Sequence, residues 1–282
     1  MTPAPHLTRA INRFTRASIG LQKIREKDAI AKAHLLNVEA FFQKQYHSVM
    51  LRFMFMQEYF PQVPPEPVRL MEAKHPINQA ALDRWVNIWD SVEFDTTPDL
   101  QKVVKGIERD ALLRGADQLR AQLQFDPEKT FSLSNPRAVA FFRRTGGSVD
   151  YIKGIQQTTA DSLKGVITTA LDEGWSYNDT AKEIKKLYDG PISTDRARLI
   201  ATHEAAQAYE YGNRAFADSI KDEGIEMEKM WTTSHDSRVS DGCAENEADG
   251  WIPIDQPHSS GHQEPPRFPG CRCYEQYRQV KA

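Results

Sequence analysis

The chain has 282 residues, of which 40% are hydrophobic, and its formal net charge is -3. That much apolar sequence can form a core, which excludes a disordered tail, and the near-balanced charge favours neither DNA nor an anionic membrane as a partner. No run approaches the roughly 20 apolar residues of a membrane-spanning helix, and the first 21 residues lack the apolar stretch of a secretion signal. We therefore expect a protein without membrane contact that is made and kept in the cytosol.

Positive charge is concentrated at the N-terminal end. Residues 1–32 carry two acidic residues, Glu26 and Asp28, and seven basic ones. A segment of this kind can bind DNA phosphates weakly, although charged runs are more often the solvated face of a helix. The seven basic residues are Arg9, Arg13, Arg16, Lys23, Arg25, Lys27 and Lys32.

A long amphipathic helix is predicted from Asp28 to Phe60, because apolar residues recur there at spacings of three and four. The Pro-rich stretch 61–67 cannot continue a helix and is interpreted as a hinge. The apolar stripe is either internal core or a contact surface for another subunit. Its members are Leu35, Val38, Phe42, Tyr46, Val49, Phe53, Met56 and Phe60.

Two further helices and a short one are expected in the next 80 residues. A Trp-containing helix includes Trp85 and Trp89, and a second helix begins with Thr97 as its N-cap and Pro98 in its first position. The pair Asn135-Pro136 repeats this start signal for a short helix that Gly146-Gly147 ends. Residues 1–148 are therefore predicted to form a helical N-terminal region.

Three more helices are predicted before Gly224. The first carries an apolar face from Ile152 to Ala170 and ends at Gly174, and Ser176 resembles the N-cap of the second. The second stops at 189–191, and the third runs from near Ser193 to about Ile220 with many alanines, which indicates close helix packing.

Short strands are expected at 227–232, 251–254 and 271–277, separated by loops rich in Gly, Pro, Ser and Asp. The predicted fold class is therefore mainly α. It comprises a helical N-terminal half and a helical body, 149–282, whose last part, 225–282, is a small α+β cap of short strands and long loops.

Common catalytic motifs are missing from the sequence. His203-Glu204 resembles the start of a zinc-protease motif, but Gln207 stands where the second histidine is required. No nucleophile elbow or phosphate-binding loop occurs, so we expect no enzymatic activity. Glu204 is instead predicted to be a buried carboxylate paired with a cation from the C-terminal cap. The acidic loop Asp241, Glu245, Glu247 and Asp249 is interpreted as solvated surface.

A structural zinc site is the main hypothesis for the cysteines. Cys243, Cys271 and Cys273 are the three thiols of the chain, and His262 completes a predicted set of four ligands, with His235 and His258 also nearby in sequence. Cysteine and histidine are the preferred ligands of tetrahedral zinc, and a small loop-rich cap gains stability from a metal. Reduced, packed cysteines and a disulfide are the alternatives left open.

Several blocks of the C-terminal half resemble a known family. The alanine-rich helix Arg196–Phe216 is followed by Met230-Trp231-Thr232-Thr233 and then by Asp236-Ser237-Arg238-Val239. Two further blocks close the set, Gly250–Ile254 and Pro265–Cys273. In this order the blocks resemble the phage head-morphogenesis domain of Mu F-type minor head proteins, and the helices from Ile152 to Tyr188 are similar to that family's lead-in.

The resemblance implies a structural component of a tailed-phage head. Members of the family associate with the portal and with other capsid or scaffold proteins inside the head, and assist head assembly or DNA packaging and ejection. Such a protein resides in the host cytoplasm during assembly and then inside the virion head. Contact between the Leu35–Phe60 stripe and the portal would fit this role.

The family pattern also assigns residues. Trp231, Asp236 and Arg238 become structural, and Arg238 and Arg272 are expected to donate to carboxylates such as Glu204. Ser240 and Phe268 occupy positions where relatives often keep a cysteine and a histidine, which leaves fewer metal ligands in this chain.

Two other functions are alternatives to a purely structural role. A DNA-binding internal head protein would use residues 1–32. A toxin-like hydrolase would use His235, Asp236 and the acidic loop.

Overall fold

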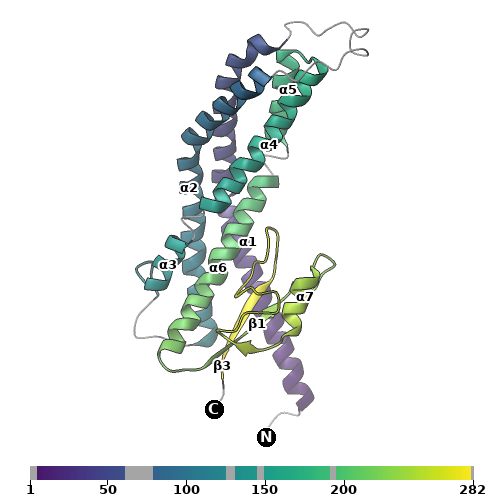
Figure 1. Cartoon of the computed structure of the whole chain (residues 1–282). Coiled ribbons are helices and arrows are strands. Elements are labelled where there is room, and N and C mark those ends of the chain that lie inside the picture. The colour runs from purple at the N-terminus through teal and green to yellow at the C-terminus, as the bar shows by residue number, and fades with distance from the viewer. Residues whose placement is uncertain (1–4, 61–78, 125–130, 145–148, 191–194, 281–282) are drawn as a thin grey trace. The chain divides into compact units, whose positions relative to one another are not determined.

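Figure 1 shows a computed structural model of the chain, which describes residues 5–60, 79–124, 131–144, 149–190 and 195–280. Three predicted features lie outside these residues: the Pro-rich hinge at 61–67, the helix end at Gly146-Gly147 and the helix start near Ser193. The chain is mostly helical with a small antiparallel sheet near its C-terminal end, as the sequence predicted. The helices are α1 (Pro5–Phe53), a 3-10 helix η1 (Met54–Tyr59), α2 (Gln79–Leu123), α3 (Pro136–Arg144), α4 (Val149–Glu173), α5 (Tyr177–Asp189), α6 (Arg196–Asp222) and α7 (Asp241–Ala248).

The sheet has the strand order β2-β1-β3 and both pairings are antiparallel. Strand β1 (Met227–Thr232) has the predicted bounds, whereas β2 (Ile252–Pro253) is shorter than predicted. Strand β3 (Tyr274–Gln279) begins three residues later than predicted, because its ladder with β1 starts at the pair Thr232 and Tyr274. The two flanking cysteines, Cys271 and Cys273, therefore precede the strand.

The prediction of a helix start at Thr97 and Pro98 is wrong, because α2 continues through Pro98. Proline removes one backbone hydrogen bond, but Val92, Thr96 and Leu100 form an uninterrupted buried face across it. The Thr96 hydroxyl donates to the Val92 carbonyl at 2.7 Å. The Thr97 hydroxyl accepts from Gln156 at 3.2 Å instead of capping a helix.

Other helix ends follow the predicted local chemistry. The Ser176 hydroxyl accepts the Asp179 backbone N–H at 3.2 Å and caps α5. Gly174 has a φ of 67° just after α4, and the Trp175 N–H donates to the Ala170 carbonyl at 2.8 Å, the bond of a Schellman stop. Helix α1 starts at Pro5, upstream of the predicted start at Asp28.

The chain folds into two compact units, each assembled from separate parts of the sequence. Unit 1 comprises 1–34, 105–144 and 199–282, and unit 2 comprises 35–104 and 145–198. The predicted domain boundary at 148/149 stays a prediction. In unit 2, most of the α1 stripe is internal core, because Val38, Phe42, Val49, Phe53, Met56 and Phe60 are at most 4% exposed.

In unit 1, α6 and α2 approach at backbone distance. A Cβ added to Gly212 would lie 2.0 Å from the Leu112 carbonyl oxygen, and one added to Gly115 would lie 2.0 Å from that of Tyr209. Alanines of α6 at 201, 205 and 208 are buried. The predicted close packing of the alanine-rich helix is thus confirmed, and it depends on glycines as much as on alanines.

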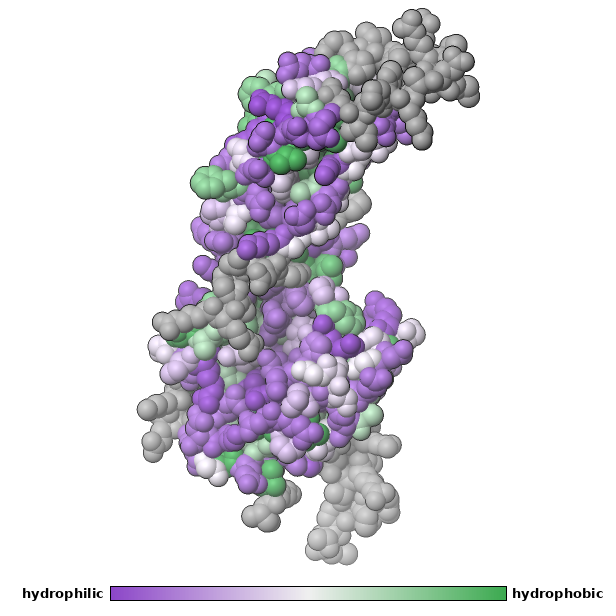
Figure 2. Space-filling model, viewed as in Figure 1, coloured by the Kyte–Doolittle hydropathy of each residue, from purple (hydrophilic) through white to green (hydrophobic). Residues whose placement is uncertain are grey.

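The face seen in Figure 2 carries mainly hydrophilic residues with hydrophobic ones between them in small groups. Across the described part of the chain, we find no helix with enough length and apolar character to cross a membrane.

Candidate functional site

The first feature of unit 1 is the outer edge of its sheet. Strand β3 is an edge strand, so its outward backbone groups need partners other than a neighbouring strand. Helix α1 supplies them: the Lys27 ammonium donates to the Cys273 carbonyl at 2.9 Å, and the Lys23 ammonium to the Glu275 carbonyl at 2.7 Å. The outward N–H of Glu275 donates to the Glu210 carboxylate of α6 at 3.2 Å. Side chains of two helices thus close the open edge.

The same contacts form a buried electrostatic seam, which we define as Lys23, Lys27, Glu210, Glu275 and His258. Lys27 and Glu210 make an ion pair at 2.9 Å with their side chains 6% and 0% exposed. Burial lowers the pKa of Lys23 to about 8, against the opposing charge of Glu210. A buried ammonium and a buried carboxylate each need this compensation, because neither can be solvated there.

The seam continues beyond β3 into the C-terminal loops. The Glu275 carboxylate contacts His258 Nε2 at 3.1 Å, and the other ring nitrogen of His258 lies 3.6 Å from Asp249. Burial raises the pKa of Glu275 to about 7, while its hydrogen bond with His258 opposes the rise. Asp249 also accepts the Ser259 N–H at 2.8 Å. These contacts fix the loop around His258 to the sheet and to the end of α7.

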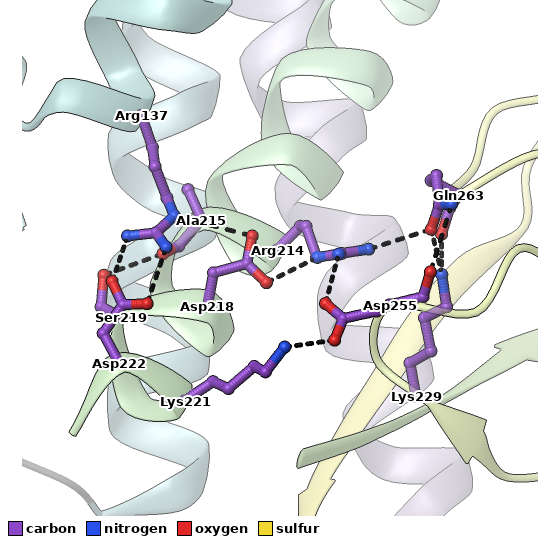
Figure 3. A network of polar contacts seen from close by, with 10 residues as sticks. All are labelled: Arg137, Arg214, Ala215, Asp218, Ser219, Lys221, Asp222, Lys229, Asp255 and Gln263. Carbon is purple, nitrogen blue, oxygen red and sulfur yellow. Dashed lines mark hydrogen bonds and ion pairs between the residues drawn. The ribbon is translucent and has the colours of Figure 1, made fainter. Parts of the chain in front are cut away.

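A second polar network covers the adjoining part of unit 1 (Figure 3). Arg137 of α3 donates to Asp222 of α6 at 2.7 Å, and Arg214 binds Asp218 at 2.9 Å. The buried Lys229 ammonium donates to the Gln263 backbone carbonyl at 2.6 Å. Most of these side chains have a partner of opposite charge, so this network holds elements together rather than presenting free charge. In the same network, Lys221 pairs with Asp255, and Asp255 also lies 3.8 Å from Arg214.

The three cysteines form a separate cluster. Cys243 lies in the first turns of α7 and Cys271 and Cys273 precede β3, yet their sulfur atoms all lie within 4.8 Å of one another. Their side chains are buried with that of Trp231, and all three thiols are free. The Sγ atoms of Cys243 and Cys271 are 3.9 Å apart, well beyond the roughly 2.05 Å of a disulfide.

This cluster lines a pocket of about 70 Å³ together with Ser240 and Phe268. The Arg267 guanidinium donates to Ser240 Oγ at 3.2 Å and lies 4.0 Å from the Cys243 sulfur. A hydrogen bond from Cys273 lowers the pKa of Cys271 to about 5, although burial opposes this. Cys271 is therefore the first of these two thiols to ionise.

The histidines predicted as extra ligands lie elsewhere. His262 Nδ1 is within 3.0 Å of the Ser260 hydroxyl, and His258 is engaged by Glu275. His235 Nε2 lies 3.2 Å from Glu247 and the side chain is exposed. Three of the four predicted ligands are therefore together, and among the described residues His262 is not grouped with them.

Arg238 and Arg272 pair differently from the prediction. Arg272 Nη2 donates to Asp236 Oδ1 at 2.6 Å, and Arg238 Nη2 lies 3.9 Å from the other oxygen of Asp236. The expectation that they donate to Glu204 is wrong, because both contact the carboxylate of Asp236 instead, Arg238 from the same loop and Arg272 from the segment before β3. The bond to Arg272 keeps the pKa of Asp236 below its usual value.

Glu204 was predicted to pair with a cation from the cap, and this is also wrong. It is 1% exposed, and neither carboxylate oxygen has a hydrogen-bond partner. Burial, with the charge of Glu108, raises its pKa to about 8, so the group is protonated at neutral pH. Burial likewise lowers the pKa of the adjacent His203 to about 4. Glu210, about one and a half turns further along α6, is a buried carboxylate that does pair with a cation, Lys27.

The prediction that Asp241 to Asp249 form a solvated acidic loop is wrong in part, because Asp241–Ala248 form helix α7. Asp241 and Glu245 are exposed as expected, but Glu247 accepts the Thr233 N–H at 3.2 Å and the Thr233 hydroxyl at 2.9 Å. The Thr233 hydroxyl is thereby buried and directed to a carboxylate. Glu247 therefore ties α7 to the end of β1.

The comparisons with known proteins concern the same region. Residues 161–275 match the family described as Phage Mu protein F like protein. These residues are a Mu F-like segment. All the blocks that carried the resemblance fall within it, so the predicted relationship is confirmed for this part of the chain.

One relative is an uncharacterized protein of Haemophilus influenzae, 27% identical over 131 residues, which is 46% of this chain and 28% of that relative. The chain thus spans less than a third of the relative's length. No solved structure matches the chain.

The residues that the sequence did not reveal are Lys23 and Lys27. They lie outside the Mu F-like segment, yet their ammonium groups bind its α6, its strand β3 and the residue before that strand. Their spacing of four along α1 places them on one helix face, but a basic pair at that spacing is usual on solvated helices as well. Nothing local distinguishes a buried lysine from an exposed one.

Proposed function

We propose that the chain is a minor head protein of a tailed phage, a structural component that lies inside the capsid and associates with the portal during head assembly or DNA packaging and ejection. The Mu F-like segment at 161–275 is the observation that carries this proposal. The proposal includes no catalytic step.

The polar interior of unit 1 supports a role in assembly. The Mu F-like segment is held to the first helix of the chain by a buried ion pair and by hydrogen bonds that need correct geometry on both sides. A rigid unit made in this way offers fixed surfaces to neighbouring subunits. Exposed side chains such as Phe94 and Leu36, 81% and 74% exposed, are available in unit 2 for such contacts.

Cross-linking tests the portal contact. Particles from a strain carrying the gene are treated with a lysine-reactive cross-linker, and linked peptides are identified by mass spectrometry. We expect links from exposed lysines such as Lys182 to the portal subunit. Buried Lys23 and Lys229 serve as internal controls and should stay unmodified. A chain present in particles but linked solely to tail proteins would contradict the proposed position.

DNA binding through residues 1–32 is a second candidate function, but fewer basic side chains are available for it than the sequence indicated. Lys23 and Lys27 are buried in unit 1 and cannot reach phosphate, while Arg25 and Lys32 are exposed. If these two contact DNA, replacing both with alanine should reduce the slope of log affinity against log salt by about 2. An unchanged slope would show that Arg25 and Lys32 do not contact DNA.

A further inference from the structure

We propose that Cys243, Cys271 and Cys273 bind one zinc ion through their three thiolates, with a solvent molecule from the adjoining pocket as the fourth ligand. The metal site does not depend on the proposed function, because it rests on side-chain positions within unit 1 alone.

The sulfur positions fit one tetrahedral ion. Two thiolates bound to zinc at about 2.3 Å and a tetrahedral angle lie roughly 3.8 Å apart. Cys243 and Cys271 have their sulfurs 3.9 Å apart, and the third sulfur completes a set within 4.8 Å. The three side chains come from two segments separated by 28 residues, so local sequence does not force them together.

The charge around the cluster is also suitable. With all three cysteines bound as thiolates around a dication, the site carries a net charge of -1. The Arg267 guanidinium, 4.0 Å from the Cys243 sulfur, offsets this charge. Gly242 leaves room for it, since a Cβ there would lie 2.5 Å from Arg267 Nη1.

Solvent is the fourth ligand because the protein groups at the pocket are unsuitable or occupied. Among the described residues that line it, no carboxylate or imidazole is present, and the Ser240 hydroxyl accepts from Arg267. The pocket of about 70 Å³ has room for a water molecule. Without a base beside that water, the ion serves to join α7 to the segment before β3.

The experiment combines metal analysis with cobalt substitution on the full chain, purified under reducing conditions. We expect one zinc per chain, and a cobalt form with a thiolate charge-transfer band and tetrahedral d–d bands. Cys271→Ser should weaken metal binding at least about tenfold, because even the loss of a residue that only hydrogen-bonds to a metal ligand lowers metal affinity by that factor.

Ser240→Cys is the decisive variant, because it adds a fourth thiolate at the pocket without removing any ligand. The charge-transfer band should rise by about one third, as four cobalt–sulfur bonds replace three, and zinc should bind more tightly. His262→Asn is the matched control and should leave the cobalt spectrum unchanged.

Substoichiometric metal in the unmodified chain, with no tetrahedral cobalt spectrum, would overturn the site. A spectrum that Ser240→Cys leaves unaltered, or that His262→Asn weakens, would overturn the assignment of solvent to the fourth position. A Cys243–Cys271 disulfide in the freshly purified chain would overturn the site as well.

Discussion

At the scale of single residues, Glu204 shows what burial without a partner does to a carboxyl group. Its pKa rises from 4.5 to about 8, so the folded chain keeps a proton there that the unfolded chain releases. The free energy of unfolding therefore falls as pH rises from about 4.5 to 8, and the contribution is constant above that window.

We predict that Glu204→Gln removes this pH dependence. The variant should match the unmodified chain near pH 5 and be more stable by about 1 to 3 kcal/mol at pH 8.5, because no charge needs to be buried. Urea unfolding at the two pH values measures the difference. Equal effects of the substitution at both pH values would show that Glu204 does not titrate in this window.

Lys27 is the opposite case, a buried charge with a partner. Lys27→Met leaves the Glu210 carboxylate unpaired and should lower the free energy of unfolding by about 3 to 5 kcal/mol. The double variant Lys27→Met, Glu210→Gln should recover part of this loss. Lys32→Met, on an exposed position of the same helix, should change stability by less than about 0.5 kcal/mol. Similar losses of stability for Lys27→Met and Lys32→Met would contradict a buried ion pair between Lys27 and Glu210.

At the scale of elements, α2 and α6 of unit 1 cross at close range. Gly212→Ala places a Cβ 2.0 Å from the Leu112 carbonyl oxygen, and a backbone atom cannot move aside as a flexible side chain would. We expect a loss of about 1 to 3 kcal/mol in thermal unfolding. Gly165→Ala in α4 is the control, because nothing lies within 4 Å there, and it should stabilise by about 0.5 to 1 kcal/mol. Equal effects would refute the close crossing.

Pro98 gives a test of the continuity of α2. The side chain is exposed, so Pro98→Ala loses no packing and restores one backbone hydrogen bond, which should stabilise by about 1 to 3 kcal/mol. A proline in the first turn of a separate helix would behave differently, because proline is favoured there. A neutral or destabilising effect in chemical unfolding would thus favour two helices.

The elements show where sequence patterns are informative. Strand β1 and the Ser176 cap were predictable because alternation and capping are local. The continuity of α2 was not, since it depends on tertiary burial of Thr96 and Leu100 outweighing one lost hydrogen bond. Helix α7 was missed because its acidic sequence lacks an apolar stripe, and its buried anchors are Cys243 and Asn246.

At the scale of the whole molecule, the Mu F-like segment is divided between the two units, with 161–198 in unit 2 and 199–275 in unit 1. In unit 1, residues 1–34 and 105–144 join the second part, and the two lysines of α1 supply partners for the edge of β3. The grouping of three cysteines followed from their composition and spacing. The buried electrostatic seam could not be predicted in this way, because Lys23 and Glu275 are 252 residues apart and no local rule pairs them.

We propose that this chain is a component of a phage head whose Mu F-like segment functions together with α1. Quantitative mass spectrometry of DNA-filled particles tests it most directly, comparing the unmodified chain with the Lys27→Met and Lys32→Met variants at equal expression. We predict that the unmodified chain and Lys32→Met are incorporated alike, whereas Lys27→Met is depleted. Absence of the unmodified chain from both assembling and filled heads would contradict a role in the phage head.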